Sequence, residues 1–175
     1  SIEVDMSSRA MKVREISEKF YLVNNSKKTE ILCHFIKEED WYQALIFVRT
    51  KYGADNLVKR IRRSGLEAVA LHGNKSQSQR RKAIEDFRRN KVHLLVATDI
   101  AARGIDVEGL SHVVNYNLPA VPEDYVHRVG RTGRAGNKGI AISLVSAEEK
   151  KLLADIEKFV GFKTTYCELP LLHPE

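Results

Sequence analysis

The segment Ala44-Leu-Ile-Phe-Val-Arg-Thr50 places an unbroken apolar run directly before polar residues, and a helical pattern follows it. Because the run does not alternate, it is typical of a strand that is covered on both faces of its sheet. The helical pattern ends at Gly65, and its apolar stripe has the spacing of one helix face: Ala54, Leu57, Val58 and Ile61. This segment therefore predicts a buried strand followed by an amphipathic helix.

The same alternation continues on both sides of that segment. Further apolar runs lie at residues 20–23, 68–71, 94–97, 113–116 and 140–145. Between them are helix signals: an apolar stripe from Ile31 to Ile36, the capping boxes Ser76–Gln79 and Ser146–Glu149, Pro122 in a first turn, and Gly161 after a last one. Strands that alternate with helices in this way predict an α/β fold, with a mostly parallel sheet of about six strands and helices on both faces.

The chain has 175 residues, the length of one domain, and its 43% hydrophobic and 30% charged residues are ordinary for a globular protein. No window approaches the roughly 20 apolar residues of a membrane span. Two cysteines without a CxxC pair favour a reducing, cytoplasmic setting, and the net charge of +6 favours a polyanionic partner. We expect an edge or interdomain linker at 1–18, the domain at 19–168, and a second edge at 169–175.

In a parallel sheet, ligands bind outside the carboxyl ends of the strands, so the functional residues should follow the apolar runs. The residues there are polar or basic, and most can bind phosphate: residues 49–51, 72–75 and 98–99, with Arg128, Arg131 and Arg134 after the fifth run. A helix that begins at Ser76 would add a site for an anion at its N-terminus.

The most informative segment is 127–136, in which three arginines alternate with glycines at 130, 133 and 136. Residues three apart share one side of a helix, so the three guanidinium groups can converge there. Guanidinium matches the geometry of phosphate oxygens, and the glycines suit a tight turn or a close approach. The alternative is a glycine-rich turn with solvated arginines. The segment 96–106 is equally open, since it would also suit a plain strand-to-helix turn with an aspartate N-cap.

Four segments in order resemble motifs IV, IVa, V and VI of DEAD-box RNA helicases: residues 44–50, 72–80, 97–106 and 125–134. The resemblance runs from about Lys19 to Val160, and residues 74–77 and 119–127 are most similar to the bacterial RhlE-type subgroup. It implies the second of two RecA-like domains, each a three-layer αβα sandwich. ATP and RNA would bind in the cleft between them.

The resemblance also implies roles for particular residues. Arg131 and Arg134 resemble the arginine fingers that reach the γ-phosphate of ATP, and Gly104 and Asp106 resemble further ATP contacts. The residues that resemble contacts to the RNA backbone are Thr50, Gly73, Gln77, Arg80 and Thr98. Those that would couple the two domains are Asp99, Arg103, His127 and Arg128.

The parts of the first domain are not found in this sequence. It contains neither a GxxxxGK[ST] phosphate loop nor an Asp-Glu-Ala-Asp run for Mg²⁺. We therefore expect the first domain to hold the Mg²⁺ of ATP, and we expect this chain alone not to hydrolyse ATP. The histidines show no ligand spacing, so the sequence predicts no metal site here.

Other classes of protein remain open. A related motor that acts on DNA would share much of the pattern. A free-standing RNA-binding module without catalysis would explain the charge and the missing ATPase parts. A dinucleotide-binding enzyme fits poorly, since no GxGxxG follows a strand.

Overall fold

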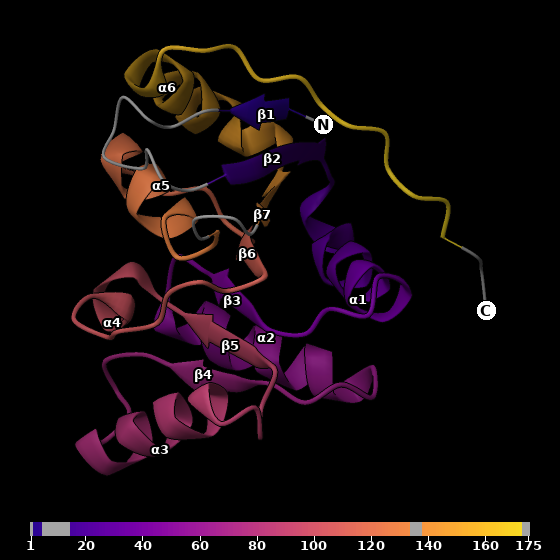
Figure 1. The fold of residues 1–175 in the computed structure, drawn as a ribbon. Coiled ribbons are helices and arrows are strands. Elements are labelled where there is room, and N and C mark those ends of the chain that lie inside the picture. Colours follow the sequence, from indigo (N-terminus) through magenta and orange to yellow (C-terminus); the bar gives the residue numbers. More distant parts are fainter. Residues whose placement is uncertain (1, 5–14, 134–137, 173–175) are drawn as a thin grey trace.

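The computed structural model describes residues 2–4, 15–133 and 138–172, which form a three-layer sandwich around one sheet (Figure 1). The seven strands described run in the spatial order β1-β2-β7-β6-β3-β5-β4. Strand β1 is antiparallel to β2, and the other six strands are parallel, which confirms the predicted sheet. The strands are β1 (Ile2–Val4), β2 (Glu15–Leu22), β3 (Ala44–Phe47), β4 (Val69–Leu71), β5 (Leu94–Ala97), β6 (His112–Asn115) and β7 (Lys138–Val145).

Helices cover both faces of the sheet. One face carries α1 (Lys28–Glu38) and α2 (Lys51–Arg63); the other carries α3 (Gln77–Arg88), α4 (Asp99–Ala102), α5 (Pro122–Val129) and α6 (Lys150–Val160). Two short 3-10 turns, η2 (Asn25–Lys27) and η3 (Ala147–Glu149), precede α1 and α6. Within the described ranges, no helix has the length and apolarity needed to cross a membrane.

Strand β3 shows why the runs are apolar throughout. Ala44 and Ile46 pack in the cluster beneath α1 and α2, whereas Leu45 and Phe47 pack in the cluster beneath α3 and α4. All four side chains are buried, because successive residues of a strand point to opposite faces and both faces are covered.

The predicted helix boundaries agree with the structure where a cap defines them. Ser76 accepts a hydrogen bond from the backbone N–H of Gln79, and the Gln79 side chain accepts one from the Ser76 N–H, which completes a capping box. Glu149 closes the second capping box with Ser146, at η3. Gly161 ends α6 with a φ of +87°, a conformation that favours glycine.

Strand β2 begins earlier than the apolar run indicated. Residues 15–18 belong to the sheet, although the sequence placed them outside the domain. The apolar pattern missed them because Ser17 and Glu18 are polar side chains that are nevertheless buried. Glu18 accepts a hydrogen bond from the Tyr125 hydroxyl, a partner that sequence periodicity does not reveal. At the other end, the backbone N–H of Cys167 donates to Phe20 O, so the segment after α6 passes back over β2.

Candidate functional site at the carboxyl edge of the sheet

The carboxyl ends of four parallel strands lie in one row: Leu71 is level with Ala97, Ala97 with Phe47, and Phe47 with Asn115. The neighbouring β7 continues two residues beyond Ser143, which is level with Asn115. The residues that follow these positions therefore meet along one edge of the sheet. The N-termini of α2, α3, α4 and α5 begin at the same edge, and each N-terminus carries partial positive charge.

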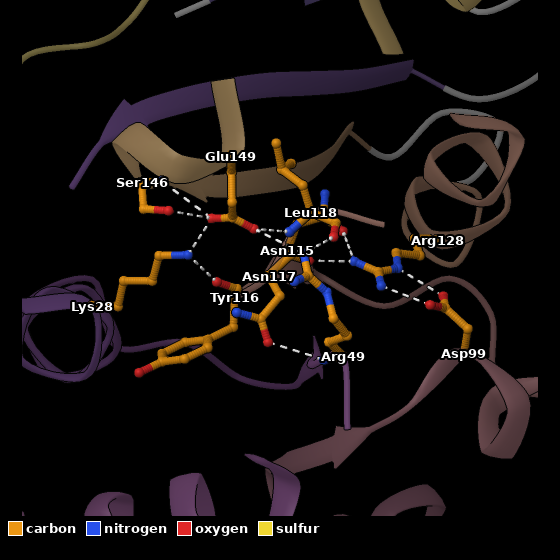
Figure 2. Close-up of polar contacts among 10 residues, drawn as sticks. All are labelled: Lys28, Arg49, Asp99, Asn115, Tyr116, Asn117, Leu118, Arg128, Ser146 and Glu149. Atoms are coloured by element: carbon orange, nitrogen blue, oxygen red, sulfur yellow. Dashed lines mark hydrogen bonds and ion pairs between the residues drawn. The ribbon is translucent and has the colours of Figure 1, made fainter. Parts of the chain in front are cut away.

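Arg128 is the centre of a buried network at this edge (Figure 2). Its guanidinium makes a two-pronged ion pair with Asp99, with Nε–Oδ1 and Nη2–Oδ2 distances of 2.7 Å. Nη1 donates to Asn115 Oδ1 at 3.1 Å and to Asn117 O at 2.6 Å, and the group lies over the Phe47 ring. The side chain is only 2% exposed, so Arg128 joins α5, β6 and α4 and is not available to a ligand phosphate.

The expectation that one helix carries three arginines is wrong. Helix α5 ends at Val129, and Gly130 follows as its cap. Arg131 therefore lies in the turn after the helix and not on the side of Arg128. The physical reason is that glycine weakens a helix interior, and a glycine follows each of the three arginines within two residues. Arg134, the other predicted finger, lies outside the described residues.

Arg131 is half-buried and holds the loop that follows α4. Nη1 donates to Ile105 O at 2.8 Å, and Nη2 donates to Ala102 O at 3.1 Å. A longer contact of 3.5 Å joins Nη1 to Val107 O. A guanidinium has five N–H donors, so these contacts leave two for an incoming oxygen.

That loop carries three of the predicted site residues. Gly104 is exposed and has a φ of +78°, so the backbone turns there in a conformation that favours glycine. Arg103 precedes it and is 67% exposed. Asp106 is exposed too; its backbone carbonyl accepts from Arg88 Nη2 at 2.8 Å, which ties the loop to the end of α3.

A hollow of about 290 Å³ lies between this loop and α5. It brings together six of the predicted residues: Asp99, Arg103, Gly104, His127, Arg128 and Arg131. Asp106 does not line it. Asp124, which was not among the predicted site residues, also lines the hollow, with Oδ1 3.6 Å from Arg103 Nη2 and 3.7 Å from His127 Nδ1. Its carboxylate thus faces the two exposed basic side chains of the rim.

Thr50 and Thr98 are both helix N-caps. Thr50 Oγ1 accepts from the Gly53 N–H at 3.0 Å, and Thr98 Oγ1 accepts from the Ala101 N–H at 3.4 Å. The cap of α4 is therefore Thr98 and not Asp99, whose carboxylate binds Arg128. A hydroxyl that accepts in this way keeps its own hydrogen, so both groups can still donate to a phosphate oxygen.

The loop after β4 is anchored by the buried His72 and exposes Gly73 to solvent. His72 is buried between Asp55, at 2.9 Å from its Nε2, and the Asn74 N–H, which donates to its Nδ1 at 3.2 Å. This arrangement fits a neutral ring with its proton on Nε2. Gly73 is exposed, and a Cβ added there would meet nothing within 4 Å. The fold itself therefore does not require glycine at this position.

The remaining predicted residues lie on the first turn of α3. Gln77 is exposed and Arg80 is half-buried. Lys51 Nζ lies 3.3 Å from Asn74 Oδ1, which links the start of α2 to the loop before α3. The structure therefore brings the segments of Thr50, Gly73 and Gln77 to one part of the edge.

A buried ion pair beside β7 was not found from the sequence (Figure 2). Lys28 Nζ lies 2.5 Å from Glu149 Oε1, and Glu149 Oε2 accepts from the Leu118 N–H at 2.7 Å. Burial opposes ionisation of Glu149, but Lys28 and the backbone N–H groups of Leu118 and Ser146 outweigh it and lower the pKa of this carboxyl. The partners are 121 residues apart, so no local pattern could pair them.

In the part of the chain that the structure describes, no three histidine, cysteine, aspartate or glutamate side chains are grouped closely enough to hold a metal ion. At the hollow itself, Asp99 is committed to Arg128 and Asp124 faces Arg103 and His127. Since both carboxylates at the hollow are engaged by cationic side chains, its chemistry suits phosphate better than a divalent cation.

Comparison with known proteins agrees with this geometry. The model of the helicase conserved C-terminal domain matches residues 27–136. The chain is 39% identical over 159 residues to the DEAD-box ATP-dependent RNA helicase RhpA of Helicobacter pylori, which covers 91% of this chain and 32% of that protein. It is 38% identical over 170 residues to the ATP-dependent RNA helicase RhlB of Pseudomonas syringae, covering 97% of this chain and 43% of that protein.

Solved structures show the same fold. A DEAD-box protein from Methanococcus jannaschii superposes with a TM-score of 0.81 at 43% identity, covering 87% of this chain and 42% of that one. The C-terminal domain of the DEAD-box protein Dbp5 superposes with a TM-score of 0.76 at 36% identity, covering 83% of this chain and 86% of that domain.

The fold, the polar residues at the carboxyl edge of the sheet and the matching family model together define a helicase C-terminal domain. Within that class, the chain belongs to the DEAD-box RNA helicase family and corresponds to its C-terminal RecA-like domain. It spans about a third to less than half of the length of the relatives RhpA and RhlB.

Proposed function

We propose that this chain is the C-terminal half of an ATP-dependent RNA helicase that acts with an N-terminal RecA-like domain of the same protein. The observation that carries the proposal is the hollow at the carboxyl edge, which Arg103, Arg128 and Arg131 line beside the exposed turn at Gly104. On this account ATP is the substrate, the first domain holds its Mg²⁺, and the protein works in the cytoplasm within the RhlE-type subgroup.

The nucleotide side of the proposal rests on Arg131, Arg134, Gly104 and Asp106. Arg131 keeps two donors after holding the loop of residues 102–107. Guanidinium groups at this position would neutralise charge on the transferring phosphoryl group, an effect of about 10³- to 10⁵-fold in other NTPases. The exposed Gly104 lets a ligand approach the backbone, and the exposed carboxylate of Asp106 would accept from a ribose hydroxyl.

The RNA side of the proposal rests on Thr50, Gly73, Gln77, Arg80 and Thr98. These groups offer hydroxyl, amide, backbone N–H and guanidinium donors beside the N-termini of α2, α3 and α4. Such groups fix a phosphate backbone in place without reading bases, so binding should depend strongly on salt and weakly on sequence.

In the mechanism we infer, Arg128 and Asp99 keep the two binding regions in register. When ATP draws the two domains together, both grip one RNA strand, and a strand held in a bent form cannot stay paired. ATP hydrolysis then weakens the closure of the two domains and releases the RNA strand. His127 and Arg103, at the exposed rim of the hollow, would contact the first domain, with Asp124 beneath them.

The direct test compares this chain with the whole protein. The chain alone should bind single-stranded RNA with an affinity that falls steeply with salt, and should not release phosphate from ATP. The whole protein should hydrolyse ATP in an RNA-stimulated way. Hydrolysis by the pure chain would contradict the division of labour. A whole protein that binds RNA and never hydrolyses ATP would instead indicate an RNA-binding module.

A further inference from the structure

A second recess extends from the loop of Lys75, at the carboxyl edge, along the free side of β4. It has a volume of about 470 Å³, and its walls are one face of α2 and one face of α3. The α2 residues are Asp55, Val58, Lys59 and Arg62, the α3 residues are Gln79, Lys82, Ala83 and Asp86, and Val69, Ala70 and Lys75 complete the lining. We call this recess the β4 groove.

The floor of the β4 groove is the edge of the sheet. Among the described residues, strand β4 ends the sheet and pairs only with β5 (Figure 1). The Thr98 N–H donates to Leu71 O at 3.4 Å, so Leu71 faces β5. Because the bonding direction alternates along a parallel strand, the N–H and C=O of Ala70 face the open side. An extended peptide could add there as a further strand.

The charges of the β4 groove fit one kind of peptide. Four cations line it, Lys59, Arg62, Lys75 and Lys82, against the two carboxylates of Asp55 and Asp86. Both carboxylates are already engaged: Asp55 lies 2.9 Å from His72, and Asp86 lies 3.0 Å from Lys82. Within the described ranges, the exposed side chains of Lys59 and Arg62 have no ion-pair partner. The surplus charge is therefore positive.

Strand β4 uses only some of the devices by which edge strands avoid pairing. It is short, with three residues, but it carries neither a lysine nor a proline. The residues of β4 are valine, alanine and leucine, and the cations are placed on the flanking helices. Val58 and Ala83 line the recess beside the strand but are themselves buried, so the exposed part of the lining is mainly polar and charged.

We propose that the β4 groove binds an acidic, extended segment of a partner protein by strand addition to β4. Backbone pairing to Ala70 would supply affinity, and the cations on α2 and α3 would select acidic side chains. The proposal does not rest on ATP or RNA binding at the carboxyl edge, and it places the partner along β4, next to the segment from Gly73 to Gln77.

The test uses a fluorescein-labelled heptapeptide that alternates glutamate and valine, with fluorescence anisotropy on the full chain. The peptide should bind, a lysine–valine peptide should not, and N-methylation of its backbone should abolish binding because the methyl groups block strand pairing. The double variant Lys59→Glu, Arg62→Glu should weaken binding by about tenfold, since two favourable charges become unfavourable. The control Lys150→Glu, Lys158→Glu makes the same change of charge on α6 and should leave binding within about twofold.

Three results would overturn the proposal: no binding of the acidic peptide at millimolar concentration, equal binding of the N-methylated peptide, or equal loss in the α6 control. A single-stranded RNA oligonucleotide provides the remaining arm. RNA that displaces the peptide, and loses its own affinity in the Lys59→Glu, Arg62→Glu variant, would assign the β4 groove to nucleic acid. RNA binding that is unchanged in that variant supports a protein partner.

Discussion

The two parts of the carboxyl edge use their polar groups differently. Around β6, Arg128 and Asp99 spend most of their hydrogen-bonding capacity on each other and on neighbouring backbone. Around β4, Gly73 and Gln77 are exposed, and no described residue provides a partner for the Gln77 side chain. Similar polar residues at strand ends thus form a rigid frame around Arg128 and Asp99 and a contact surface around Gly73 and Gln77. Substitutions in the frame should lower stability, whereas substitutions in the contact surface should lower RNA affinity.

Arg128→Ala should have the largest effect, because it leaves the Asp99 carboxylate without its partner and empties a buried site beside Phe47. Loss of one member of a buried ion pair costs about 3 to 5 kcal/mol of unfolding free energy. Urea denaturation measures this cost. Arg103→Ala, at a side chain that is 67% exposed, is the matched control and should stay within about 0.5 kcal/mol of the parent. Similar losses in both variants would break the comparison.

Glu18→Gln tests a second buried polar contact of α5, the hydrogen bond from Tyr125 to Glu18 on β2. Burial raises the pKa of the Glu18 carboxyl to about 7, and the hydrogen bond from Tyr125 only partly opposes this. Between pH 4.5 and 7 the folded state therefore binds more protons than the unfolded state, so the unfolding free energy should fall as pH rises. The loss by pH 8 should be on the order of 3 kcal/mol, and Glu18→Gln should remove it.

The readout for Glu18→Gln is a series of urea denaturation curves from pH 5 to pH 8. The parent and the variant should diverge as pH rises, with the variant the more stable at pH 8. Two curves that stay parallel over this range would show that Glu18 does not titrate there.

Arg80→Ala addresses the contact surface. We expect single-stranded RNA affinity to fall by about tenfold and the salt slope to fall by about 0.7, the value for one phosphate contact. Stability should change little. Arg60→Ala removes the same side chain from the last turn of α2, away from the carboxyl edge, and serves as the control. A fall of the same size in Arg60→Ala would show that only overall charge matters.

Thr50→Ala should lower the unfolding free energy by about 1 kcal/mol, since it removes one N-cap hydrogen bond. Thr50→Ser keeps the hydroxyl and should restore stability. If the hydroxyl also contacts RNA, serine should restore RNA affinity as well. Thermal unfolding and RNA titration of both variants separate the two roles, and loss of affinity in Thr50→Ser would contradict the contact.

The sequence predicted the fold well wherever the signal was local. Apolar runs, capping boxes and the glycine after α6 depend on residues within one turn of each other, so they located most strands and helices. The start of β2 was missed because Glu18 is a buried polar residue whose partner, Tyr125, is 107 residues away. The Lys28–Glu149 pair was missed for the same reason.

For the site, the sequence predicted which residues would gather at the carboxyl edge, because parallel strands share that edge. It could not predict how they would divide their contacts. Arg128 and Arg131 have the same chemistry and the same spacing pattern, yet one is buried in the frame and the other lies in the turn after α5. They differ because α5 ends at Val129, between the two arginines. The position of Asp124 on α5, facing Arg103, likewise depends on the three-dimensional structure.

In the function we propose, arginines of this chain complete an ATP site formed with another domain. The most direct test of this claim is Arg134→Ala in the whole protein, with ATP turnover and RNA binding measured on the same preparation. ATP turnover should fall by about 10³-fold or more, because the charge of the transition state is no longer neutralised. The RNA affinity of the same protein should stay within about twofold of the parent. Equal losses of turnover and RNA affinity would contradict the claim.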